Sequence, residues 1–322
     1  MKLTRRAVLA LTLLPPVSLA QTWPAKPVRV IVPLLPGGSV DQSARFFAVE
    51  LSKALGEQFV VENVPGGDGT IGLARAARAV PDGHTLVVSA NSFQTISPFL
   101  SEIPLPYDTV KDFSPIAGLV SVSHVILARP DLPANTIPEL VALAKASPQH
   151  LNHGSASSTG ASYLASILFS RRAGVQFTDV FYKGAAGVYT DLMGGRLDIF
   201  FDSLGAAMPL IKAGKVKAIA TTQTRRHPLT PNVPTVAETY PGFDTSGWYA
   251  LYGPARMPPD IVNRLNAEIA KIQKSVEFQH LAATYGYEAM TGTAAQLGAT
   301  QAAELAQWGE LAKTLKPAAA AR

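Results

Sequence analysis

Residues 33–41, with the sequence PLLPGGSVD, join a turn to the start of a helix in a way that suits anion binding. They follow an apolar strand pattern at 28–32, and a helical pattern begins directly after the two glycines. The first turn of a helix offers free backbone N–H groups at the positive end of the helix dipole. Gly37 and Gly38 lack Cβ atoms, so a carboxylate can approach the main chain closely. Asp41 can brace this loop by accepting from N–H groups, and a tight turn without a ligand is the alternative.

A second segment of the same kind, GSASSTGAS at 154–162, contains four serines, one threonine and two glycines. It lies between a predicted strand and a predicted amphipathic helix. Its hydroxyl and N–H groups could bind another carboxylate from the opposite half of the protein. The alternative is an ordinary helix N-cap by Ser157, Ser158 or Thr159.

Other polar residues follow predicted strands. Asp202 comes after the apolar run 199–201, where a carboxylate either caps the next helix or meets a donor on a ligand. Ser89 and Asn91 occupy the corresponding position after the run that ends at Val88, and they would supply uncharged hydrogen-bonding groups. In an open α/β sheet, ligands bind beyond the carboxyl ends of the strands.

Several catalytic and cofactor patterns fail. Residues 67–72 fit G-x-G-x-x-G, but 86–91 carry no acidic residue for a ribose hydroxyl, so no nucleotide site is expected. There is no G-x-S-x-G or S-x-x-K, which argues against a serine hydrolase. His150 and His153 lack a neighbouring carboxylate or third ligand in the sequence, so we expect no metal site and no cofactor.

The amino terminus has the order of a secretory signal peptide. Lys2, Arg5 and Arg6 precede a mostly apolar stretch at 7–14, and small residues at 18–20 predict cleavage after Ala20. The stretch is too short to span a bilayer, although a membrane anchor is the alternative. A twin-arginine route is also open, but the general secretory route fits better. We therefore predict a periplasmic protein.

Removal of the signal peptide changes the charge balance. It lowers the basic count from 28 to 25, against 23 acidic residues, and no cluster of Lys and Arg remains that would bind nucleic acid. The mature chain of about 302 residues is long enough for two cores, and it contains no cysteine. Strand and helix patterns alternate along it, which predicts an α/β fold with largely parallel sheets. Residues 223–242 are rich in Pro and Thr and read as a surface connection.

The chain resembles the Bug family of periplasmic receptors, the solute-binding components of tripartite tricarboxylate transporters. The resemblance extends from Pro27 to about Trp308. Its markers in this sequence are PLLPGGSVD (33–41), VENVPGGDGTIG (61–72), PDGHTLVV (81–88), LPYDTVKDFSP (105–115), YKGAAGVYTDLMGGRLDIFFD (182–202), NVPTVAE (232–238), PGFDTSGW (241–248) and LNAEIAK (265–271).

The resemblance implies a two-domain clamshell of the type II periplasmic-binding-protein class with two chain crossings. One domain would combine 21–122 with 246–322, and the other would be 123–245. The implied ligand is a small carboxylate, such as an acidic amino acid, a di- or tricarboxylate or an aromatic acid. The implied ligand-binding residues are Leu35, Gly37, Gly38, Ser155, Ser157, Thr159, Ser89, Asn91 and Asp202, to which the loop analysis adds Asp41.

The same resemblance implies a non-catalytic receptor, expected to be a monomer, that docks on a two-component membrane permease. A ligand-binding sensor subunit that feeds a signalling receptor is the alternative. A secreted hydrolase using Ser157 or Ser158 is more remote, because neither serine has a base nearby in the sequence. The chain departs from the family at Tyr163, where a histidine is common, and at Phe181, where a proline is common; both could line the pocket or simply pack.

Overall fold

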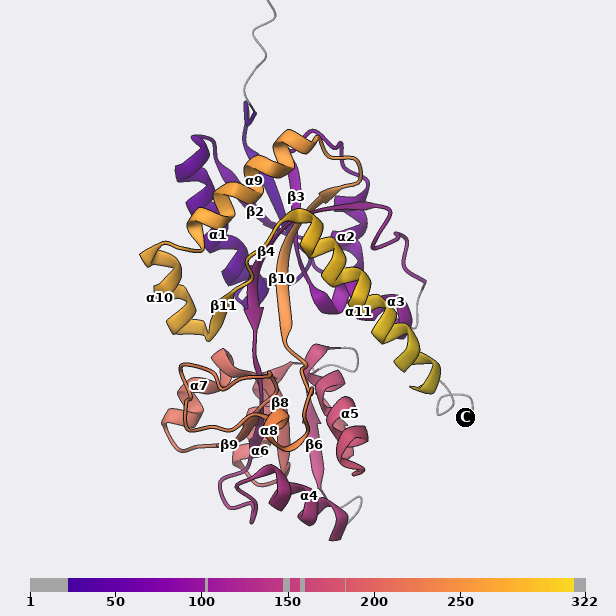
Figure 1. The fold of residues 1–322 in the computed structure, drawn as a ribbon, viewed down its shortest axis with the longest axis vertical. Helices are drawn as coiled ribbons and strands as arrows, with labels where there is room; N and C mark the ends of the chain where they lie inside the picture. Colours follow the sequence, from indigo (N-terminus) through magenta and orange to yellow (C-terminus); the bar gives the residue numbers. More distant parts are fainter. Residues whose placement is uncertain (1–22, 102–103, 147–150, 157–159, 183, 316–322) are drawn as a thin grey trace, which may run out of the picture.

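A computed structural model describes residues 23–101, 104–146, 151–156, 160–182 and 184–315. The chain forms two α/β domains, one above the other in Figure 1, each built around its own sheet. The predicted signal peptide, Ser157 and Thr159 lie outside the described residues. No helix in the described ranges is long and apolar enough to cross a bilayer.

Domain 1 is built on a six-stranded sheet with the order β11-β4-β10-β3-β1-β2. Its strands are β1 (Val28–Val32), β2 (Phe59–Asn63), β3 (Thr85–Ala90), β4 (Phe113–Val122), β10 (Gly247–Pro254) and β11 (Tyr287–Ala289). Its helices are α1 (Ser39–Leu55), α2 (Thr70–Ala77), the π-helical turn η1 (Ser92–Ile96), α3 (Ser97–Leu100), α9 (Pro259–Ile272), α10 (Val276–Tyr285) and α11 (Ala294–Leu315).

Domain 2 is built on a five-stranded sheet with the order β7-β6-β8-β5-β9. Its strands are β5 (His124–Ala128), β6 (Asn152–Ser155), β7 (Thr178–Phe181), β8 (Ile199–Ser203) and β9 (Lys217–Thr221). Its helices are α4 (Ile137–Ala146), α5 (Ala161–Ala173), α6 (Ala185–Met193), α7 (Leu204–Lys212) and α8 (Val236–Thr239).

Alternating side chains explain why helices cover both faces of the domain 2 sheet. Phe200 and Phe201 are adjacent and fully buried, and they point to opposite faces because side chains alternate along a strand. Phe201 packs with Phe169 of α5, whereas Phe200 packs with residues of α6 and α7 such as Val188. The sheet is therefore the middle layer of a three-layer domain.

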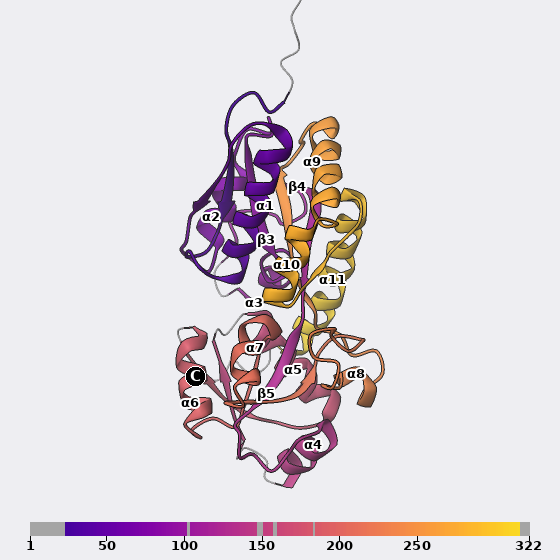
Figure 2. The same cartoon turned by 90° about the vertical axis from the view of Figure 1, so that its left-hand side faces the viewer.

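The topology directs the carboxyl ends of the parallel strands toward the other domain. The end of β3 pairs with the start of β10, at Ala90 and Tyr249, where the chain has just entered domain 1. The end of β8 pairs with the start of β5, at Ser203 and His124, where the chain has just entered domain 2. The carboxyl ends of β1, β3, β6 and β8 are therefore directed toward the space between the two domains, which lie one above the other in Figure 2.

The α/β fold is confirmed, but the sheets are mixed and not largely parallel. Strand β10 is antiparallel to both β3 and β4, and β5 is antiparallel to both β8 and β9. The antiparallel strands are those beside the two places where the chain passes between the domains. A strand that enters a domain from this side must run opposite to strands that end there.

Candidate functional site

The loop between β1 and α1 leaves its main chain open. Gly37 has a φ of +91°, which strongly favours glycine, and Gly38 has a φ of −77°, which any residue can adopt. A Cβ atom added to either glycine would meet no heavy atom within 4 Å. Gly38 is the N-cap of the 17-residue helix α1, and no side chain caps it. Leu35 in the same loop is 69% exposed. The start of α1 thus presents backbone N–H groups to an open space.

Asp41 stabilises this loop from its buried side. Its Oδ2 accepts from the Gly37 N–H and from Arg45 Nε, both at 2.9 Å, and its Oδ1 accepts from Asn63 Nδ2 at 2.8 Å. Burial alone would raise the pKa of this carboxyl, but the hydrogen bonds from Arg45, Gly37 and Asn63 outweigh it and hold the pKa below its usual value. The buried carboxylate therefore shapes the loop, as the sequence predicted for Asp41.

The second predicted loop follows β6. Ser155, the last residue of β6, is buried, and its carbonyl accepts from the Tyr182 N–H at 2.8 Å. Gly160 is the N-cap residue of α5, with a φ of −72°. The alternative that Ser157, Ser158 or Thr159 caps this helix is therefore wrong. Ser155 and Gly160 bracket the loop at the end of domain 2 that faces domain 1. A second helix start therefore faces the same space as α1.

Ser89 does not reach this interdomain surface. It is fully buried inside domain 1, where its hydroxyl accepts from Gln94 Nε2 at 3.0 Å. Gln94 in turn accepts from Gln301 of α11 at 3.3 Å, so the serine belongs to a network within the domain core. The Ser89 side chain points to the sheet face that α11 covers, since its partner Gln94 is bonded to Gln301 of that helix.

Asn91 lies between the domains but faces the chain crossings. It lines a cavity of about 280 Å³ together with Trp248 and Glu304, and Leu168 of domain 2 closes the other side. Glu304 accepts from Trp248 Nε1 at 2.6 Å and from Thr95 Oγ1 at 2.9 Å. Burial raises the pKa of Glu304 despite these bonds and a further one from Asn91. Asn91 therefore helps hold α11 in place.

Asp202 is a partly buried carboxylate near the end of β8, where the strand approaches domain 1. Its Oδ1 accepts from the N–H of Ser203, the N-cap of α7, and its Oδ2 accepts from Tyr189 Oη, both at 2.7 Å. Burial raises the pKa of Asp202 to about 6, although both hydrogen bonds oppose this change. The nearby Asp202 charge also contributes to raising the pKa of Tyr249, which lies across the interface on β10. Asp202 therefore accepts from the backbone N–H of the next residue, Ser203. Its effect on the pKa of Tyr249 shows that it lies close to domain 1.

Tyrosines are the site residues that the sequence analysis missed. Tyr287 Oη donates to the carbonyl of Ser39, the first residue of α1, at 3.1 Å, and the Tyr287 ring packs edge-on against Tyr249 at 6.2 Å. Tyr249 is only partly buried. Tyr189 sits on α6 in a YTDLM segment, and no spacing in the sequence links it to Asp202 across 13 residues.

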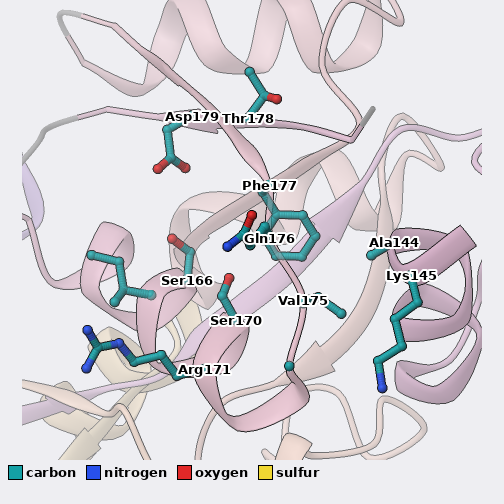
Figure 3. Close-up of a pocket in the computed structure, with 12 residues that line it drawn as sticks. Ala144, Lys145, Ser166, Ser170, Arg171, Val175, Gln176, Phe177, Thr178 and Asp179 are labelled. Carbon is teal, nitrogen blue, oxygen red and sulfur yellow. The ribbon is translucent and has the colours of Figure 1, made fainter. Parts of the chain in front are cut away.

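A wide pocket on domain 2 is not part of this arrangement. It has a volume of about 820 Å³ and lies between the end of α4, the middle of α5 and the start of β7 (Figure 3). Lys145, Phe177 and Arg171 are among its lining residues. Because it lies at the amino end of β7, it is on the side of the sheet away from the helix starts that face domain 1.

Comparison with known proteins agrees with this geometry. Residues 43–316 match the family described as tripartite tricarboxylate transporter family receptor. BugT of Bordetella pertussis is 32% identical over 295 residues, which cover 91% of this chain and 90% of BugT. The Rhodopseudomonas palustris protein Rpa4515, solved with adipate, is 30% identical with a TM-score of 0.82, covering 91% of this chain and 98% of that protein.

A second solved structure extends the comparison. MatC of Rhodopseudomonas palustris, solved with malate, is 30% identical with a TM-score of 0.78, over 90% of this chain and all of MatC. Each of these three similarities covers at least 90% of this chain. The chain belongs to the tripartite tricarboxylate transporter receptor family, whose members are periplasmic solute-binding proteins.

Proposed function

We propose that this protein binds a small carboxylate between its two domains, with the anion held by the main chain at the start of α1. The observation that carries this proposal is the open, uncapped helix start at Gly37 and Gly38. Free N–H groups there, at the positive end of a 17-residue helix, suit a carboxylate. The loop that ends at Gly160 would bind the distal end of the ligand. The adipate and malate bound to Rpa4515 and MatC support a carboxylate ligand.

Binding is proposed to close the domains about the two chain crossings, with 21–122 plus 246–322 moving against 123–245. A ligand stabilises the closed state only to the extent that it binds that state better than the open one. The protein would be exported, cleaved after Ala20, and act in the periplasm as a monomer without catalysis. The closed form would then deliver the acid to a two-component membrane permease.

A thermal-shift screen against mono-, di- and tricarboxylates tests the binding. A ligand that binds only the folded state should stabilise it by about 2.7 kcal/mol at a hundredfold excess over the dissociation constant. We expect at least one carboxylate to raise the melting temperature by several degrees. If only sugars or cations do so, the carboxylate assignment is wrong.

The transport role needs a separate measurement in cells. Deletion of the gene should abolish accumulation of the bound acid by intact cells, and the wild-type gene should restore it. Unchanged accumulation in the deletion strain would contradict a role in uptake.

A further inference from the structure

Two aromatic side chains, Phe181 and Tyr163, form a pair beside the start of α5. Phe181 is the last residue of β7, and Tyr163 lies in the first turn of α5. Their ring centroids are 5.2 Å apart and their planes are inclined by 75°, which is the favoured edge-to-face arrangement. Phe181 is nevertheless 50% exposed, so about half of its surface has no cover.

The ring of Tyr163 is held in place by Asp179 and His153. Its hydroxyl donates to Asp179 Oδ2 at 3.2 Å, and the other oxygen of Asp179 is 2.8 Å from Nδ1 of His153. The His153 ring, which is 1% exposed, lies nearly parallel to that of Tyr163, with 6.3 Å between centroids. Burial raises the pKa of Tyr163 to about 12, and Asp179 adds to this effect, so the hydroxyl stays protonated as a donor. The sequence analysis found no carboxylate near His153, because Asp179 joins it only through strand pairing.

The pair lies at the edge of the interdomain surface farthest from the chain crossings. In domain 2 the crossing strand β5 is separated from β7 by β8 and β6. In domain 1 the crossing strands β4 and β10 are separated from β1 by β3. Phe181 at the end of β7 and Leu35 in the loop after β1 therefore each lie on the part of their sheet that is away from the crossing strands. Both side chains are apolar and at least half exposed.

The charges at this surface favour a ligand with a single carboxylate. Arg45, one turn into α1, is already bonded to Asp41 and to Asn63 Oδ1. On the facing domain, Asp202 supplies a carboxylate. A second anionic group on the ligand would be repelled near Asp202, whereas a flat apolar group fits the exposed face of Phe181.

We propose that Phe181, positioned by Tyr163, is a specificity-determining residue that stacks on the flat apolar body of the bound acid and selects an aromatic monocarboxylate over a small dicarboxylate. This inference rests on the proposed carboxylate site. The α1 start holds the carboxylate, and the ring of the acid extends toward the open edge, where Leu35 covers its other face when the domains close.

Calorimetric titration with benzoate and with succinate tests the preference. We expect the wild-type protein to bind benzoate more tightly. Phe181→Ala should weaken benzoate binding about tenfold, since an aromatic pair and its buried area together are worth on the order of a tenfold change. The same substitution should leave succinate affinity within about twofold. Phe181→Leu, which keeps apolar bulk without the ring, should give an intermediate loss for benzoate.

Three further variants separate stacking on the ligand from general effects on the protein. Tyr163→Ala should weaken benzoate binding, whereas Tyr163→Phe, which keeps the ring, should retain most of it. Met193→Ala is the matched control, because Met193 is an exposed apolar residue of domain 2 at the far end of α6, and it should change neither affinity. Unfolding curves of each variant verify that the fold is intact.

The outcomes distinguish this inference from the proposed function. Succinate binding as tight as benzoate binding, or an equal loss of both acids in Phe181→Ala, contradicts the inference and leaves the carboxylate site standing. Failure to bind either acid or any other carboxylate contradicts both.

Discussion

At the scale of single residues, Asp41 explains how an open glycine loop keeps one shape. Its carboxylate takes three hydrogen bonds while its side chain is only 3% exposed, so the loop is fixed from the inside and its outer face stays free. The sequence predicted that Asp41 braces the loop by accepting from an N–H group, and the bond from the Gly37 N–H confirms this. Only the structure shows that the Asp41 carboxylate also accepts hydrogen bonds from Arg45 and Asn63.

Asp41→Asn should therefore destabilise the fold and weaken ligand binding. An amide cannot accept all three bonds, and a buried donor left unpaired costs about 1–3 kcal/mol. Because the pKa of Asp41 is lowered by folding, its stabilisation is present above pH about 4 and is lost as the pH falls below that value. Urea denaturation at pH 7 and at pH 3 measures both effects. Asp260→Asn, which alters the exposed first-turn aspartate of α9, should change little; an equal loss there would contradict the brace.

Asp202 should give the opposite dependence on pH. Its pKa of about 6 lies above the ordinary value of 3.8, so between pH 4 and 6 the folded protein holds a proton that the unfolded chain has released. The free energy of unfolding should fall as the pH rises through this window. Asp202→Asn removes the titration, and its unfolding free energy should fall less between pH 4.5 and 7 than that of the wild type. Parallel pH profiles would show that Asp202 titrates normally.

At the scale of elements, the two domains touch where α7 meets the corner between α10 and β11. A Cβ atom on Gly205 of α7 would come within 1.8 Å of the carbonyl oxygen of Tyr285, so the two backbones are in direct contact. Arg225 of domain 2 pairs with Glu288 of β11 at 2.5 Å beside this contact. The corner also carries Tyr287, which bonds to the first residue of α1. The position of domain 2 is thereby linked to the candidate anion loop.

Gly205→Ala should disturb this contact although Ala is the better helix former. Overpacking of this kind typically costs about 1–3 kcal/mol, which exceeds the gain of about 1 kcal/mol from helix propensity. We expect a lower melting temperature and an altered radius of gyration in small-angle scattering. Gly298→Ala is the control, because its Cβ would meet only Pro115 Cγ at 3.6 Å within a helix. A Gly205 variant as stable and compact as the control would contradict the direct contact.

The elements themselves show what the sequence could reveal. The predicted strand at 28–32 and the predicted helix start directly after the two glycines are confirmed as β1 and α1, because an apolar run and turn residues mark them. Strand β4 was missed, because Pro115 and Gly118 interrupt its pattern and both sides of it are buried. Helix α10 was missed for a similar reason: its apolar residues do not form one stripe. The pairing of β4 with β10, over more than a hundred residues, leaves no local signal.

At the scale of the whole molecule, the strand topology directs the two predicted loops toward the same space between the domains. The sequence identified both helix starts, but only the antiparallel crossing strands turn their sheets so that the carboxyl ends face each other. The described part of the interdomain surface combines main-chain donors at the start of α1, the partly buried carboxylate of Asp202 and exposed apolar side chains. This combination is in keeping with a family of solute-binding proteins.

The central claim is that the main chain at the start of α1 binds the carboxylate, and Gly38→Val tests it most directly. The φ of Gly38 suits valine and the space above it is empty, so the variant should fold with an unchanged melting temperature. The added side chain would occupy the space that the anion needs. Calorimetric titration with the acid found in the screen should show affinity reduced at least about a hundredfold, a loss of about 2.7 kcal/mol. Affinity equal to that of the wild type would contradict the account.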